Sequence, residues 1–147
     1  MGIGTAIAAA LTRLAGGGKV VGRAVIGEAT ELPPALVARF PELAGARWRR
    51  GGLPVRVGGW CLGQKSVSAI TLWRTIWLAP DVHPSPELLL HELRHVAQFE
   101  ASAAFPLLYV WESLRRGYVG NRFEVDARTY AAFRVRQPDD RHPERMS

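Results

Sequence analysis

The pattern of apolar and polar positions is clearest between Ser85 and Ser102. Apolar residues recur there at helical spacing and gather on one side of the expected helix, while His91, His95 and Gln98 gather on another. The segment opens with serine followed by proline, which is typical of a helix start, because serine caps free amides and proline tolerates the first helical position. We predict a helix from about 85 to 102, anchored in the core by its leucine-rich side.

Two more helices are expected after this one. The first begins near Pro106 and ends at Gly117, since glycine commonly closes a helix. The second begins near Asn121 and ends before Pro138. Upstream, residues 33–44 resemble one short helical piece broken by a proline. The C-terminal half of the chain is therefore expected to be mainly helical.

Strand patterns occupy the middle of the chain. Leu53, Val55 and Val57 recur with period two, which is the spacing of a strand with one buried face. Residues 66–79 are rich in β-branched and aromatic side chains and predict either one long bent strand or a pair of strands. The order of these elements predicts an α+β fold, in which a small twisted sheet is followed by three helices.

The length of 147 residues favours one domain. We divide it into a glycine-rich N-terminal arm over 1–30, the folded domain over 31–136, and a flexible polar tail over 137–147. No apolar run approaches the ~20 residues needed to cross a bilayer. The arm also lacks the basic start of a signal peptide, since its first basic residue is Arg13. We therefore expect no transmembrane segment and a cytoplasmic location, with export by another route as the alternative.

The chain is basic, with a net charge of +6 carried almost entirely by arginine. A basic protein can bind nucleic acid or anionic lipid. The arginines are scattered, however, and no helix-turn-helix, aromatic RNA-binding platform or zinc finger accompanies them. We expect most of them to be solvated surface charges and predict no specific binding of nucleic acid. The lone cysteine, Cys61, cannot form an internal disulfide.

The histidine side of the predicted helix at 85–102 carries potential metal ligands. His91 and His95 are four residues apart, so they stack on one face and can reach one metal ion from a rigid support. Glu92 flanks them, near enough to hold a metal-bound water but angled away from direct ligation. This spacing is the H-E-x-x-H pattern of two zinc ligands and a general base. Arg94 counts slightly against it, because the inner positions of the motif are usually uncharged.

A catalytic zinc needs a third protein ligand and an open position for water. Glu124 is the favoured candidate because Ala127 and Ala131 follow on the same helix face, so that helix can approach the histidines closely. An alternative stays open: Asn121 and Glu124 have the spacing of a helix capping box, in which the glutamate would bond a backbone amide. The less favoured ligands are Glu100, Glu112, Asp126 and His142.

The segments HELRHVAQ and GYVGNRFEVDA resemble those of the gluzincin metallopeptidases. They are most similar to small bacterial zincin domains of the minigluzincin kind, some of which occur beside contractile injection systems. The resemblance spans about residues 71–133. It implies that His91, His95 and Glu124 bind zinc, that Glu92 is the base, and that the strand at 74–79 is the sheet edge on which a peptide lies. Many gluzincins place an aspartate four residues after the ligand glutamate, where this chain has Arg128.

The resulting hypothesis is a metallopeptidase with one Zn²⁺ per chain and a peptide or protein substrate. Glu92 would take a proton from the attacking water and deliver it to the leaving amine. Tyr118 is a candidate donor to the transition state, although a tyrosine that packs in a turn is the simpler interpretation. Two alternatives remain: a zinc-binding zincin module for interaction or assembly, and a metal-free basic protein that binds nucleic acid or lipid.

Overall fold

The computed structural model describes residues 25–55 and 67–137. Within these ranges four short strands form one mixed sheet in the order β1-β2-β4-β3. The two outer pairs are antiparallel, and the central pair, β2 with β4, is parallel. The strands are β1 (Glu28–Ala29), β2 (Arg47–Arg50), β3 (Ala69–Leu72) and β4 (Thr75–Leu78).

The helices follow the predicted order, with α4 beginning where the serine and proline signal placed it. The Ser85 side chain accepts a 3.2 Å hydrogen bond from the amide of Leu88, which caps the first turn. The predicted stop at Gly117 is confirmed by the backbone, because this glycine takes a non-helical φ of 71°; a short helical stretch follows it and completes α5 up to Gly120. The helices are α2 (Pro34–Arg39), the 3₁₀ helix η1 (Pro41–Gly45), α4 (Pro86–Ala101), α5 (Phe105–Gly120) and α6 (Arg122–Arg136).

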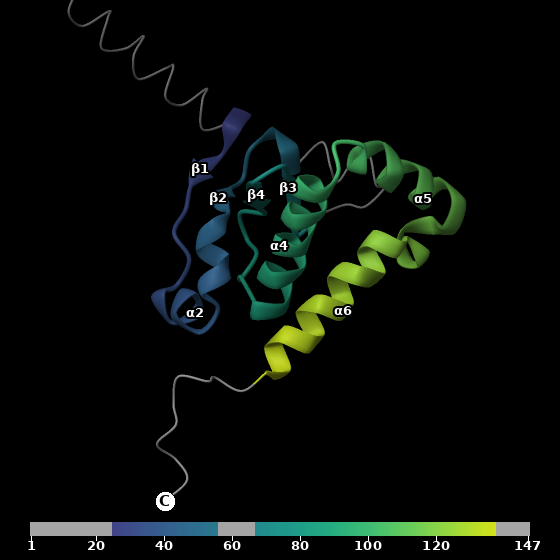
Figure 1. Cartoon of the computed structure of the whole chain (residues 1–147). Coiled ribbons are helices and arrows are strands. Elements are labelled where there is room, and N and C mark those ends of the chain that lie inside the picture. The colour runs from purple at the N-terminus through teal and green to yellow at the C-terminus, as the bar shows by residue number, and fades with distance from the viewer. Residues whose placement is uncertain (1–24, 56–66, 138–147) are drawn as a thin grey trace, which may run out of the picture.

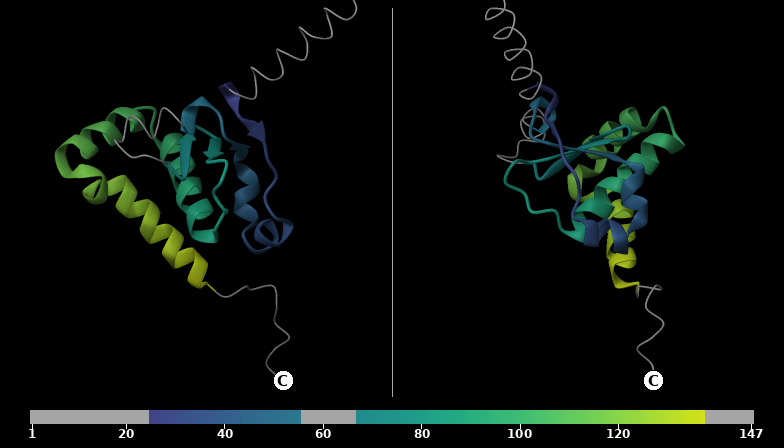
Figure 2. Two further views of the ribbon diagram at one scale, coloured as in Figure 1. Left: turned by 180° about the vertical axis from the view of Figure 1, so that it is seen from behind. Right: turned by 90° about the vertical axis from the view of Figure 1, so that its left-hand side faces the viewer.

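Helix α4 lies between the sheet and α6 (Figure 1), and the view from behind in Figure 2 shows the same order of layers. Its leucine-rich side packs on the sheet, where Leu89 and Leu90 meet Ile76 and Leu78, all four fully buried. The opposite side of α4 faces α6. The predicted α+β fold, with a small sheet followed by three helices, is confirmed.

The strand at 53–57 is wrong as predicted. Leu53 to Val55 are helical, and Val57 lies outside the described residues. In the described part of this segment the alternation does not mark a buried strand face, because Leu53 is exposed while Val55 is buried. The strand that the prediction missed is β2, whose sequence RWRR is rich in charge. Its arginines stay at the surface or bond to main-chain carbonyls, while Trp48 alone fills the core.

The segment at 66–79 forms a pair of strands, one of the two predicted alternatives. The hairpin turns at Trp73, which has a φ of 53° and is 70% exposed. The prediction that 74–79 is the sheet edge is wrong. Strand β4 is central, because it pairs with β2 on one side and β3 on the other. Among the described strands, β3 is the edge next to α4.

The ends of the chain are described only in part. Residues 28–29, which the sequence analysis assigned to the arm, form the edge strand β1. The rest of the arm up to residue 24, Cys61, and the tail from residue 138 lie outside the described ranges. In those ranges, no helix combines the length and apolarity that crossing a membrane requires.

Candidate metal centre

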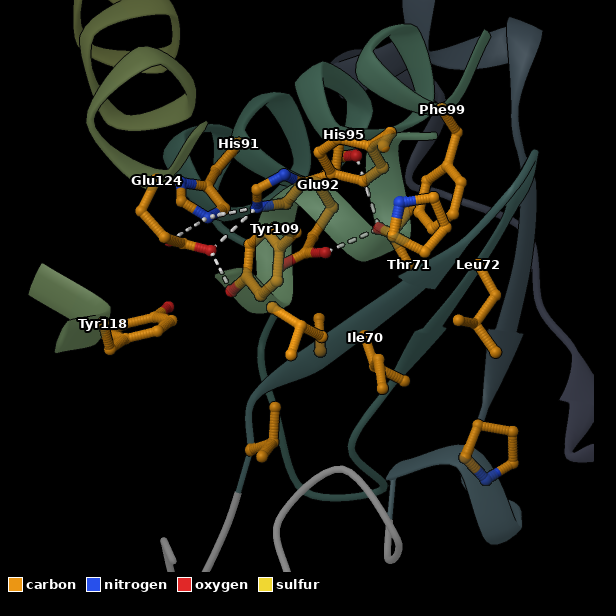
Figure 3. Close-up of a pocket in the computed structure, with 16 residues that line it drawn as sticks. Ile70, Thr71, Leu72, His91, Glu92, His95, Phe99, Tyr109, Tyr118 and Glu124 are labelled. Atoms are coloured by element: carbon orange, nitrogen blue, oxygen red, sulfur yellow. Dashed lines mark hydrogen bonds and ion pairs between the residues drawn. The ribbon is translucent and has the colours of Figure 1, made fainter. Parts of the chain in front are cut away.

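Three side chains converge between α4 and α6 (Figure 3). The Nε2 atoms of His91 and His95 are 3.2 Å apart. The carboxylate of Glu124 faces both, with Oε2 3.3 Å from Nε2 of His91 and Oε1 3.2 Å from Nε2 of His95. These residues form a group of potential metal ligands whose donor atoms all lie within 4.8 Å of one another. We call them the His-His-Glu cluster.

Small residues bring the two helices together, as the sequence indicated. Ala127 and Ala131 of α6 are buried at 0% and 3% exposure, one and two turns after Glu124. The capping-box alternative does not describe this helix start. Asn121 caps α6 by itself, since its side-chain oxygen accepts a 2.9 Å hydrogen bond from the amide of Phe123. The Glu124 side chain is therefore available to the histidines.

The cluster holds a buried negative charge. Burial opposes the charged form of Glu124, but the facing imidazoles of His91 and His95 outweigh it and hold the pKa of the carboxyl well below its usual range. Burial likewise opposes protonation of His95. Its contact with Glu124 and the negative charges nearby overcome that cost and raise the pKa of the imidazole. The site therefore keeps the Glu124 carboxylate ionised beside two imidazoles, and this arrangement favours the binding of a cation.

The donor set and its spacing fit a zinc ion. Zinc binds imidazole nitrogen and carboxylate oxygen at about 2.0–2.2 Å in tetrahedral sites, which separates neighbouring donor atoms by roughly 3.3–3.6 Å. The three separations in the cluster are 3.2, 3.2 and 3.3 Å. In addition, Oε2 of Glu124 is buried without a hydrogen-bond partner in the described structure. Its charged contacts are loose, with Nε2 of His91 at 3.3 Å and Nη1 of Arg128 at 4.0 Å, and a metal ion would be a stronger partner.

Gln98 fixes the orientation and tautomer of His95. Its amide nitrogen donates to the carbonyl of Phe123 at 3.1 Å and to Oδ2 of Asp126 at 2.8 Å. Both partners are acceptors only, so the amide oxygen must be the atom that faces Nδ1 of His95, 2.8 Å away. Nδ1 therefore carries the proton in the neutral ring, and Nε2 presents its lone pair to the cluster.

Arg94 supports the same arrangement. It makes a bidentate ion pair with Asp126, at 2.7 and 3.1 Å. The pair lowers the pKa of Asp126, for which the hydrogen bond from Arg94 is the largest cause. The charged residue that counted against the motif thus anchors the aspartate that holds Gln98. A chain of contacts runs from Arg94 through Asp126 and Gln98 to His95, and we call it the support chain.

Glu92 lies beside the cluster with its carboxylate oriented by the sheet. The Thr71 hydroxyl donates a 2.6 Å hydrogen bond to Oε2 of Glu92, and both residues are buried. They line a cavity of about 440 Å³ together with the His-His-Glu cluster. Most of its other walls are apolar and come from edge strand β3 and from helix α5: Ala69, Ile70, Leu72, Phe105, Pro106 and Val110.

Two tyrosines of α5 approach Glu124. The hydroxyl of Tyr109 donates a 2.7 Å hydrogen bond to Oε1, and burial together with the Glu124 charge raises the pKa of this phenol. Tyr118, the predicted donor, lines the cavity just after the Gly117 kink and is 40% exposed. Burial is also the main cause that raises its pKa, so both phenols stay protonated and able to donate.

The less favoured ligands lie elsewhere. Glu100 pairs with Arg74 on the surface, and Asp126 belongs to the support chain. Glu112 is buried but faces Arg116 and Arg122 at 3.4 and 3.9 Å. His142 lies outside the described residues.

At the position where gluzincins place an aspartate, Arg128 bonds the carbonyl of Val119 and lies 4.0 Å from Oε2 of Glu124. A guanidinium accepts no hydrogen bond, so Arg128 cannot orient a histidine as that aspartate does. In this chain the described contact that orients His95 comes instead from Gln98, on α4 itself.

Sequence reasoning missed Thr71 and Tyr109. A signal existed for Thr71, because strand alternation puts it on the same buried face as Ala69, where a polar side chain needs a partner. For Tyr109 the signal was weaker: it shares a helix side with Phe105 and Glu112, but no pattern in the sequence links that side to Glu124.

No protein-family model, curated protein or solved structure matches this chain.

Proposed function

We propose that this protein is a zinc-dependent metallopeptidase in which His91, His95 and Glu124 hold one zinc ion. The observation that carries the proposal is the convergence of two Nε2 atoms and one ionised carboxylate at 3.2–3.3 Å from each other. A zinc ion with three protein ligands supplies Lewis acidity, which lowers the pKa of a water in the fourth position to about 7.

In this proposal Glu92 is the general base. Its carboxylate lies in the cavity beside the histidines and is held by Thr71. It accepts a proton from the attacking water and returns it to the leaving amine. A carboxylate with one oxygen already bound to a hydroxyl keeps a fixed direction, so the second oxygen is the one that moves the proton. Tyr118, whose phenol is protonated, is the proposed donor to the carbonyl oxygen of the substrate.

The cavity supports a peptide as the substrate. Strand β3 forms the wall opposite the cluster, and in the described sheet it pairs on one side only, with β4. An extended peptide could add to such an edge through main-chain hydrogen bonds. The apolar side chains of the walls would then receive apolar substrate residues. A cytoplasmic site of action belongs to the same proposal.

The first experiment is to measure zinc in the purified, untagged protein and hydrolysis of a peptide library by the same sample. We expect about one zinc per chain. Glu92→Gln should keep the zinc and lose activity by roughly 10²–10⁴-fold, because only the proton acceptor is removed. Glu100→Gln, at the exposed end of α4, is the matched control and should retain both zinc and activity.

Other results would redirect the proposal. Zinc bound at one per chain with no hydrolysis of any peptide would favour a zinc-binding interaction module. Hydrolysis that survives Glu92→Gln would show that another group is the base. A protein that takes up no zinc after supplementation would overturn the metal centre itself.

A further inference from the structure

The outward face of α5 is apolar. Leu107, Val110, Trp111 and Leu114 are 77%, 55%, 61% and 80% exposed, and their spacing of three and four residues puts them on one stripe. We call these four residues the outer face of α5. The helix lies at the far end of the molecule from α2 and β1, as both Figure 1 and Figure 2 show.

The inward face of the same helix is only partly apolar. Phe105 packs there against Phe99 and Phe123, but Tyr109 reaches Glu124, and the buried Glu112 pairs with Arg116 and Arg122. An ordinary surface helix has the reverse arrangement, with its apolar stripe toward the core. A contiguous apolar stripe of this kind on the surface marks a site of interaction.

The exposed charges beside the outer face are basic. Arg115 is exposed and follows Leu114 directly, while Arg116 of α5 and Arg122 at the start of α6 are 53% and 56% exposed, although both also contact the buried Glu112. The only acidic residue in α5 is Glu112, and it is buried at 7% exposure. The surface of α5 therefore combines an apolar stripe with a basic end, and α5 contributes no exposed acidic residue to it.

We propose that the outer face of α5 binds the surface of an anionic lipid bilayer. Helices that lie in the membrane interface combine an apolar face with basic residues. Tryptophan favours the interface because its ring is apolar and its N–H is polar, as at Trp111. Each arginine near an anionic surface adds attraction, and the cytoplasmic leaflet is the anionic one in cells.

Charge separates this partner from a second copy of the chain. In a dimer formed through two outer faces, the arginines at the end of α5 would enter the interface. No exposed acidic residue of α5 would be there to pair with them. An anionic surface satisfies both the stripe and the arginines. The stripe is also continuous with the cavity, since Val110 lines it together with Tyr118. Binding would therefore place the cavity beside the bilayer; that this positions the site for membrane-bound substrates rests on the proposed function.

The test is co-sedimentation of the full chain with vesicles. One set contains phosphatidylcholine alone, and the other includes about one-third phosphatidylserine. We expect binding to the anionic vesicles that weakens with added salt. Leu107→Gln combined with Leu114→Gln should weaken it about tenfold or more. Arg115→Gln should weaken it about fivefold. The matched control is Val125→Gln with Phe133→Gln, which removes two exposed apolar residues of α6 and should change nothing.

Four outcomes overturn the inference. The first is no sedimentation with either vesicle. The second is equal binding to both vesicles, because then the charge of the lipid does not matter. The third is an equal loss in the α6 control, because then this face does not matter. The fourth is a dimer in analytical ultracentrifugation that the leucine pair abolishes without any vesicle binding, which would make the face a self-interface. Zinc content is measured on the same samples, so failure here is distinguishable from failure of the metal centre.

Discussion

Helices α4 and α5 are each 16 residues long and depart from the usual distribution of residues in opposite ways. Helix α4 buries polar groups: Glu92 and His95 are 6% and 7% exposed. Helix α5 exposes apolar groups, with Leu107 and Leu114 at 77% and 80%. Burying an ionisable group costs free energy of folding, and exposing an apolar stripe lowers solubility.

The two departures differ in how the molecule compensates them. The departure in α4 is compensated inside the molecule, since each buried polar group meets another: His95 meets Gln98 and Glu92 meets Thr71. The departure in α5 is not compensated by any contact within the described ranges. A metal ion would complete the first arrangement, and a surface outside the molecule would complete the second.

We expect the strongest effect from a change in the ligand that α6 brings to the histidines of α4. Glu124→Gln removes the negative charge of the cluster but keeps its shape, and we expect zinc affinity to fall by roughly 1,000-fold or more, beyond what changes in supporting residues cause. Glu112→Gln is the matched control. It is the other buried glutamate with an oxygen that lacks a hydrogen-bond partner, and it should leave zinc affinity unchanged. Competition with a chelator measures both. Zinc lost in the control instead would make Glu112 the ligand.

Removing a leucine should change the free energy of unfolding very differently in the two helices. Leu90→Ala in α4 removes a side chain with 0% exposure, and we expect a loss of about 2–5 kcal/mol in the free energy of unfolding. Leu114→Ala in α5 removes one with 80% exposure and should change that free energy by less than about 0.5 kcal/mol. Urea titrations of both variants provide the measurement. A large loss from Leu114→Ala would mean that the outer face is covered in the folded protein.

The sequence predicted α4 well because several local signals agreed. A serine cap, a proline at the first position and a continuous apolar stripe all specify one helix, and the two histidines inherit their spacing from it. The meeting with Glu124 was predictable to the extent that Ala127 and Ala131 marked a close helix contact. These are features that neighbouring residues carry by themselves.

The sheet was harder to predict because its strands depend on distant partners. Strand β2 reads as a basic stretch, and only its register with β4 makes it a strand, with Trp48 opposite Ile76. The edge position of β3 follows from strand order, which no local pattern encodes. For the same reason the sequence could not show that Thr71 reaches Glu92 or that Tyr109 reaches Glu124, since each pair joins different elements.

A smaller effect tests the support chain. Gln98→Leu keeps the side-chain volume and removes the acceptor of His95 Nδ1, so the ring loses its fixed tautomer. We expect zinc affinity to fall about 10–100-fold. Gln98→Glu restores an acceptor and should recover part of the loss, although it places a carboxylate beside Asp126. A structural role alone would not give this recovery. Equal affinity in wild type and Gln98→Leu would show that the support chain does not orient His95.

The smallest effect separates the base from the metal. Thr71→Val keeps the branched shape of the side chain and removes the hydroxyl that donates to Glu92. Because this bond positions the carboxylate without touching the cluster, zinc content should stay at the wild-type level while kcat falls about tenfold, the worth of one hydrogen bond. Thr71→Ser should retain most of the activity. If zinc content falls together with kcat, Thr71 holds α4 in place against β3. The sheet would then position the polar groups buried in α4 as much as their contacts with one another do.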